Sequence, residues 1–186
     1  MTTPDLYFIA AIGLFFSILV VIAGYYWVRS RRSPEADWEV LFAKLTWIDR
    51  NNIAEVALDL VDESGQPKAS EDDESLEPSR LWSLIGGLEG LEALERNSDV
   101  LIELVFYIQK WYPEALVIAE QLRLDARELK WHVARLRGAD RKGDLQVSFP
   151  FYAQRAVVRY YLMTRRVLSL YEAANFSMRA QLQRTL

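Results

Sequence analysis

The one histidine of the chain, His132, is the residue whose chemistry is easiest to judge from sequence. It lies in the stretch LKWHVARL, and the chain has no second histidine and no cysteine with which it could share a metal ion. Glu128 precedes it by one helical turn, so a hydrogen bond between side chains on one helix face explains the pair more simply than catalysis does. We therefore predict neither a catalytic residue nor a metal site.

Motifs of nucleotide-binding and hydrolytic enzymes are absent from the sequence as well. The stretch GGLEGLEALE, residues 86–95, contains glycines, but they lie within a helical pattern and not at a strand-to-helix turn. Glu92 and Glu95 in this stretch are interpreted as a solvated helix face. The sequence predicts no cofactor and no small-molecule substrate, and an enzyme without a sequence signature is kept as the second alternative.

The stretch VIAEQLRLDARELKWHVARLRG, residues 117–138, combines apolar spacing with basic side chains. With Asp125 as a cap between two short helices, it is similar to a DNA-binding helix-turn-helix. The similarity departs from the motif at Arg123, which stands where the turn usually has glycine. It implies a recognition helix that carries Arg127, Lys130, Trp131 and Arg135.

Charge is distributed unevenly along the chain. Residues 1–121 hold 9 basic and 21 acidic residues, whereas residues 122–186 hold 13 basic and 5 acidic ones, within a net charge of −4. The basic half has two explanations: it contacts an anionic partner, or it neutralises the acidic half within the fold. The candidate contacts to an anionic partner are Arg127, Lys130, Arg135, Arg137, Arg141 and Lys142.

Residues 6–28 contain no charged side chain and predict a membrane-spanning helix. At 1.5 Å per residue this run is about 34 Å long, slightly more than a hydrocarbon core. Aromatic residues suited to the headgroup region lie near its two ends: Tyr7, Tyr25, Tyr26 and Trp27. The positive-inside rule places the C-terminal domain in the cytoplasm and the N-terminus outside, because three arginines follow the run: Arg29, Arg31 and Arg32.

One stripe of the predicted membrane helix consists of small residues and one valine. Such stripes let two membrane helices approach closely, so we predict a possible homodimer or a partner helix at this face. The residues of the stripe are Ala10, Gly13, Ser17, Val20 and Gly24.

The remainder of the chain has a helical period and no convincing strand, so the predicted fold class is all-α. We expect about six helices after the membrane helix, with helix boundaries near Ser98, Asp125 and Gly138. Gly86, Gly87 and Gly90 are expected to mark either close helix packing or a kink. The predicted divisions are an extracytoplasmic N-terminus (1–5), the membrane helix (6–28), a juxtamembrane helical segment (29–61), an acidic flexible loop (62–78) and a helical bundle domain (79–186).

Aromatic residues and arginines alternate between 149 and 166, where we expect core on one side and solvated arginine on the other. Surplus aromatic residues that remain exposed would form a surface for a partner. The leading hypothesis is a non-catalytic, single-pass protein of the cell (inner) membrane whose cytoplasmic helical bundle binds a protein or supports assembly of a membrane complex. The first alternative is a membrane-tethered DNA-binding regulator that uses residues 117–138.

Overall fold

The structure, a computed structural model, describes residues 12–24, 38–58 and 76–174 of the chain. Two compact units are distinguished, residues 1–35 and residues 36–186, and each is described by itself. All regular structure in the described residues is helical, which confirms the predicted all-α class.

In the first unit, residues 12–24 form a helix whose side chains are all exposed. Within it, the Ser17 hydroxyl donates a 2.8 Å hydrogen bond to the Gly13 carbonyl, and nothing lies within 4 Å of a Cβ built on Gly13 or Gly24. Over the residues described, no helix combines the length and the hydropathy that a membrane crossing requires. Other residues singled out in the predicted span and beside it lie outside the described residues: Tyr7, Ala10, Tyr25, Tyr26, Trp27, Arg29, Arg31 and Arg32.

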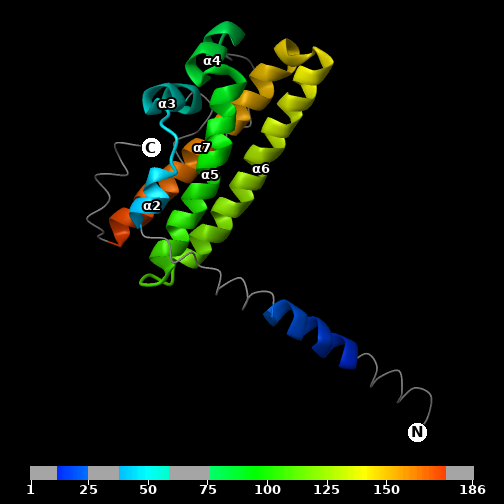
Figure 1. The fold of residues 1–186 in the computed structure, drawn as a ribbon, viewed down its shortest axis with the longest axis vertical. Coiled ribbons are helices and arrows are strands. Elements are labelled where there is room, and N and C mark those ends of the chain that lie inside the picture. The colour runs from blue at the N-terminus through cyan, green and yellow to red at the C-terminus, as the bar shows by residue number, and fades with distance from the viewer. Residues whose placement is uncertain (1–11, 25–37, 59–75, 175–186) are drawn as a thin grey trace, which may run out of the picture. The chain divides into compact units, whose positions relative to one another are not determined.

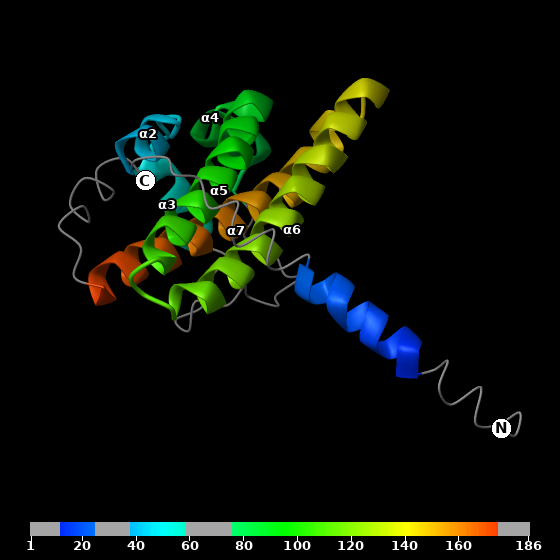
Figure 2. The ribbon, with the colours of Figure 1, turned by 60° about the horizontal axis from the view of Figure 1, so that its bottom comes forward.

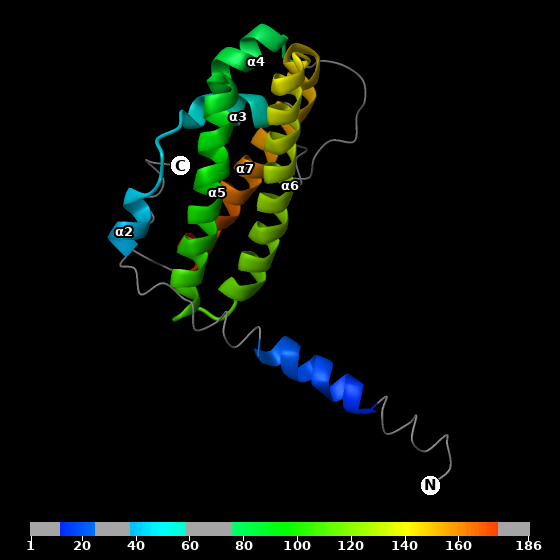
Figure 3. The same cartoon turned by 45° about the vertical axis from the view of Figure 1, so that its right-hand side comes forward.

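The second unit is a bundle of three long helices with three short ones packed on it (Figure 1). Contacts join α5, α6 and α7 to one another, while α2 packs on α5 and α3 packs on α7 (Figure 2). The short helix α4 lies at the end of the bundle where α5 begins (Figure 3). The helices are α2 (Trp38–Ala43), α3 (Arg50–Leu58), α4 (Pro78–Ile85), α5 (Gly87–Gln109), α6 (Ala115–Lys142) and α7 (Leu145–Ala173). Of the predicted acidic loop, residues 62–75 lie outside the described residues.

The core of the bundle follows a spacing of seven residues on each long helix. This spacing keeps one narrow stripe of each helix turned toward its neighbours, as in coiled-coil-like packing. All the residues of these stripes are at most 2% exposed, and they are Leu94, Leu101 and Ile108 on α5, Ala115, Leu122, Leu129 and Leu136 on α6, and Phe149, Ala156, Met163 and Leu170 on α7.

A buried asparagine fixes the connection between α2 and α3 to the long helices. Asn97 is 1% exposed; its side chain accepts a 2.8 Å hydrogen bond from the Thr46 amide and donates a 2.7 Å bond to the Thr46 carbonyl. Its amide also lies 3.3 Å from the hydroxyl of Tyr160, whose pKa burial raises to about 12. Since a buried amide without partners is costly, this set of bonds favours one position of the connection over others.

Two glycines in the left-handed region end helices. Gly86, at φ +79°, caps α4 and separates it from α5, and Gly143, at φ +78°, caps α6 before α7 begins. A side chain is strained in this conformation, so glycine is the residue that can end a helix in this way. The predicted boundary at Gly138 is wrong, because α6 continues through it to Lys142.

Candidate interaction surface

The predicted DNA-binding segment, residues 117–138, lies within a single continuous helix, α6. There is no turn in it, so the two-helix interpretation of this segment is wrong. At the expected turn, Arg123 is part of the continuous helix and pairs with Glu120 one turn earlier on α6. The guanidinium carbon of Arg123 lies 4.4 Å from the ring centre of Phe106 on α5. Asp125, the expected cap, points its carboxylate into the interface between α6 and α7 and pairs there with Arg166 and Arg159.

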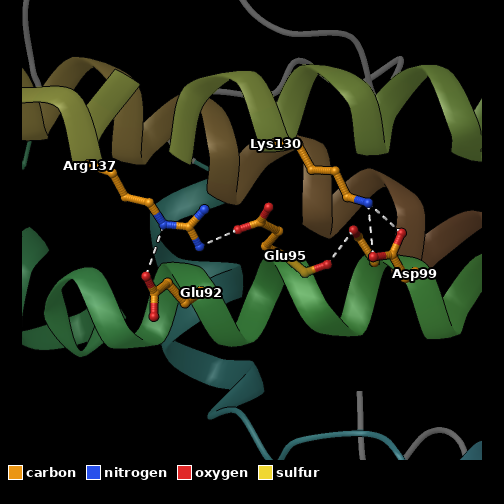
Figure 4. A network of polar contacts seen from close by, with 6 residues as sticks. Glu92, Glu95, Asp99, Lys130 and Arg137 are labelled. Atoms are coloured by element: carbon orange, nitrogen blue, oxygen red, sulfur yellow. Dashed lines mark hydrogen bonds and ion pairs between the residues drawn. The ribbon is translucent and has the colours of Figure 1, made fainter. Parts of the chain in front are cut away.

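Two of the six basic candidates, Lys130 and Arg137, contact α5 and not a free surface (Figure 4). The Lys130 ammonium donates to both carboxylate oxygens of Asp99, at 2.6 and 2.8 Å. The Arg137 guanidinium donates to Glu92 at 2.9 Å and to Glu95 at 2.7 Å, and the hydrogen bond to Glu92 raises the pKa of Arg137. These pairs neutralise part of the basic half within the fold, and they show that Glu92 and Glu95 are not merely a solvated face.

The other four basic candidates are exposed on α6: Arg127, Arg135, Arg141 and Lys142. Arg141 and Lys142 occupy the last turn of α6, where positive charge is favourable beside the free carbonyls of the helix end. Arg135 lies over the ring of Trp131, with 5.0 Å from its guanidinium carbon to the ring centre. The structure therefore does not gather the six basic residues into one site.

Aromatic rings and arginines do gather where α6 and α7 lie side by side. We call this surface the aromatic–arginine patch; it comprises Trp131, Arg135, Phe151, Tyr152 and Arg155. Trp131 and Phe151 are 49% and 51% exposed, and the Tyr152 ring centre lies 5.7 Å from that of Trp131 and 5.1 Å from that of Phe151. Each exposed ring has an arginine over it. Arg135 lies over Trp131, and the guanidinium carbon of Arg155 lies 4.1 Å from the ring centre of Phe151.

His132 lies beneath the patch, 7% exposed, with its ring centre 5.8 Å from that of Tyr152. Its Nδ1 atom is buried without a hydrogen-bond partner in the described residues. Burial lowers the pKa of His132, and the charge of Arg155 lowers it further. A neutral imidazole packed among rings suits a supporting role under the patch, because a protonated one would be buried next to positive charge.

The sequence pattern of residues 117–138 predicts a contact role for Trp131 and Arg135, but it does not place Phe151, Tyr152 or Arg155 beside them. The available signal was the spacing of Phe151 and Arg155, one turn apart on a helix, which puts an arginine over a ring. Contact with Trp131 depends on how α6 and α7 pair, which the sequence pattern does not specify. Among the described residues, no group of three or more acidic or histidine side chains is placed to hold a metal ion.

Comparisons with known proteins add no family to this description. No protein-family model matches the chain, and neither the curated proteins nor the solved structures that were searched contain a match.

Proposed function

We propose that the chain is a non-catalytic, single-pass membrane protein whose helical bundle binds a protein partner through the aromatic–arginine patch. The observation that carries the proposal is the pair of half-exposed rings, Trp131 and Phe151, each covered by an arginine. Tryptophan, tyrosine and arginine are the residues most enriched at the energetic centres of protein interfaces. Because both cations of the patch are arginines, its partner presents carboxylates together with apolar groups.

Support for membrane attachment comes from the helix of residues 12–24. Nine large apolar side chains are exposed on it, from Ile12 to Ile22, and water is an unfavourable solvent for such a helix. The arginines that follow, at positions 29, 31 and 32, favour a cytoplasmic bundle at the inner membrane and an N-terminus outside. The small-residue stripe that includes Gly13 and Ser17 would then be available for a second copy or a partner helix in the membrane.

Single introduced cysteines test this topology cleanly, because the chain contains none of its own. Thr3→Cys is expected to react with a membrane-impermeant maleimide in intact spheroplasts, since residue 3 lies outside. Gln146→Cys, at an exposed position of α7, is expected to react only after the membrane is permeabilised. Labelling of Gln146→Cys in sealed spheroplasts would contradict the proposed orientation, and loss of the chain to the soluble fraction would contradict the anchor.

Photocrosslinking in cells tests the patch. A benzophenone amino acid at position 151 is expected to form an adduct with a partner, and Trp131→Ala should reduce the yield of that adduct by about tenfold or more, as for an interface hot spot. Trp47 provides the matched control: it is 72% exposed and lies outside the patch.

Benzophenone at position 47 should form no such adduct, and Trp47→Ala should leave the adduct at position 151 unchanged. Equal crosslinking from positions 47 and 151, or an adduct at 151 that is insensitive to Trp131→Ala, would show that the patch is not the partner-binding surface.

A further inference from the structure

A line of exposed apolar side chains runs along α6, the helix that forms one edge of the bundle (Figure 1). Val117, Leu124 and Trp131 are 63%, 64% and 49% exposed and follow one another at intervals of seven residues. Seven residues are about two helical turns, so these three side chains share one stripe that extends over about 21 Å. We call them the outer stripe of α6, and at Trp131 this stripe runs into the aromatic–arginine patch.

The outer stripe faces away from the two long helices that pack on α6. Leu122 is buried in the core, and at about 100° per residue Leu124 projects from the opposite side of α6. Lys130, which pairs with α5, and Asp125, which pairs with α7, lie on the two flanks between the core and the outer stripe. A further helix can therefore approach the outer stripe without displacing α5 or α7.

Exposed charged residues border the outer stripe, with acids toward the start of α6 and arginines further along it. Glu120 and Arg127 lie along one border, and Glu114 and Arg135 lie along the other. When two copies of such a helix run antiparallel, the acid of each copy lies opposite the arginine of the other. The face is therefore complementary to itself in the antiparallel orientation.

Two acids beside the outer stripe have partners within the chain. Glu120 pairs with Arg123, and Glu128 pairs with Arg159. Both carboxylate side chains are about half exposed, and a carboxylate has acceptor sites for more than one donor. These pairs therefore still allow a contact to a cation from a second helix.

We propose that the partner of the aromatic–arginine patch is a second copy of this chain, bound by antiparallel pairing of the two α6 helices about Leu124; this rests on the proposed function, because it names the partner of the patch. Leu124 meets Leu124 of the second copy on the two-fold axis, and Trp131 meets Val117 of the second copy at both ends of the interface. Arg135 faces Glu114 of the second copy. Glu114 and Val117 lie one turn apart, so the second copy presents a carboxylate beside an apolar group, as the patch requires.

Charge distinguishes this register from its neighbours. Centred on Leu124, the pairing places Arg127 opposite Glu120 of the second copy. A shift of seven residues in one direction places Glu120 opposite Glu120, and a shift in the other direction places Arg127 opposite Arg127. Like charges in contact disfavour both shifted arrangements, so one register suits the apolar stripe and the charges together.

The interface between the two helices is small. Paired about Leu124, they overlap over about 28 Å, and a helix is about 10 Å wide. Such a face is smaller than the about 800 Å² per partner of a standard stable complex. We therefore expect a weak dimer that forms because two anchored copies share one membrane, which raises their effective concentration.

Disulfide formation in cell membranes tests the pairing, because the chain contains no cysteine of its own. Oxidation of Leu124→Cys is expected to give a disulfide-linked dimer, since residue 124 meets itself. Val117→Cys should give about tenfold less dimer, because its two copies would lie about 21 Å apart and a disulfide needs Cα atoms within about 7 Å. Coexpression of Val117→Cys with Trp131→Cys should restore a dimer between the two variants.

Gln146→Cys, exposed on α7 outside the outer stripe and the patch, is the matched control for random collision. Equal dimer yields from Leu124→Cys and Gln146→Cys would overturn the proposal. A dimer of Val117→Cys alone that is as abundant as that of Leu124→Cys would overturn the antiparallel orientation, because a parallel pair brings every stripe position to its own copy.

Charge reversal in the Leu124→Cys background tests the register. Arg127→Glu is expected to lower the dimer yield severalfold, because it places a glutamate opposite Glu120 of the second copy. Adding Glu120→Arg should restore the yield. The two positions are about 10 Å apart along one helix, so this rescue requires a contact between chains. A double variant that is as weak as Arg127→Glu would overturn the register.

The mass of the adduct formed by benzophenone at position 151 separates this inference from the proposed function. A second copy gives an adduct with the mass of a dimer of this chain. An adduct with another protein that depends on Trp131, in membranes where Leu124→Cys forms no dimer, would overturn the second copy as the partner and support the patch. A Leu124→Cys dimer without any adduct at position 151 would support the pairing of α6 and overturn the patch.

Discussion

Gly90→Ala is expected to destabilise the bundle by about 3 kcal/mol or more, because the new methyl group would collide with backbone atoms. A Cβ built on Gly90 lies 1.8 Å from the carbonyl oxygen of Ile85 and 2.8 Å from its carbonyl carbon. Flexible side chains can move away from an added methyl group, but a carbonyl at the end of α4 moves only if α4 moves. That shift would expose Leu81 and Ile85, whose burial stabilises by about 1.5–3 kcal/mol each.

Gly138→Ala is the matched control, since it makes the same change inside another helix. Nothing lies within 4 Å of a Cβ built on Gly138, so only the gain in helix propensity remains, about 0.5–1 kcal/mol of stabilisation. Thermal unfolding of the full chain, followed by circular dichroism, should show a midpoint lower by about 10 °C or more for Gly90→Ala and higher by a few degrees for Gly138→Ala. A midpoint that rises in both variants would contradict the close approach of α4 to α5.

The junction of α4 and α5 shows how far glycines can be interpreted from sequence. Their clustering predicted either close packing or a kink, and the structure has both: Gly86 and Gly87 take positive φ angles at the kink, and Gly90 lies against Ile85. Local sequence indicates that a glycine is needed. It does not indicate whether the reason is a backbone angle or a neighbour, because the neighbour's position depends on the tertiary fold.

Helix number was predicted better than helix boundaries. Six helices are described from residue 38 onward, as expected, but the predicted boundaries at Ser98, Asp125 and Gly138 all lie inside long helices. Ser98 bonds its hydroxyl to the Glu95 carbonyl within α5 and does not cap a new helix. Seven-residue core stripes continue past Ser98 on α5 and past Asp125 on α6, so burial across the bundle outweighs local capping preference at these two positions.

Surface charge was harder to predict than fold, because the partners of a charged side chain are distant in sequence. Lys130 pairs with a residue 31 positions away, and Arg137 with residues 45 and 42 positions away. The charge pattern of the sequence alone supported a single basic contact surface as well as it supported neutralisation within the fold. The aromatic–arginine patch likewise depends on the pairing of α6 with α7, which brings Trp131 to Tyr152.

Asp125→Asn is expected to destabilise the bundle by about 2–3 kcal/mol, because Asp125 is the only buried carboxylate among the described residues and pairs with two arginines. The Asp125 side chain is 8% exposed, whereas Arg159 and Arg166 are 28% and 33% exposed. An asparagine of the same size keeps one acceptor oxygen but turns an amide donor toward a second donor group. Because both arginines are partly exposed, water can solvate them in the variant. The destabilisation by Asp125→Asn is therefore smaller than for an ion pair that is fully enclosed.

Glu128→Gln separates burial from charge in this interface. Glu128 also pairs with Arg159, on the same two helices, but its side chain is 51% exposed. Neutralising an exposed carboxylate should lower the free energy of unfolding by at most about 1 kcal/mol. The difference in this free energy between wild type and Glu128→Gln should become smaller at high salt, because salt screens the wild-type ion pair. Urea unfolding at low and high salt measures both variants. Equal destabilisation by Asp125→Asn and Glu128→Gln would mean that Asp125 acts as a surface charge and not as the buried link between α6 and α7.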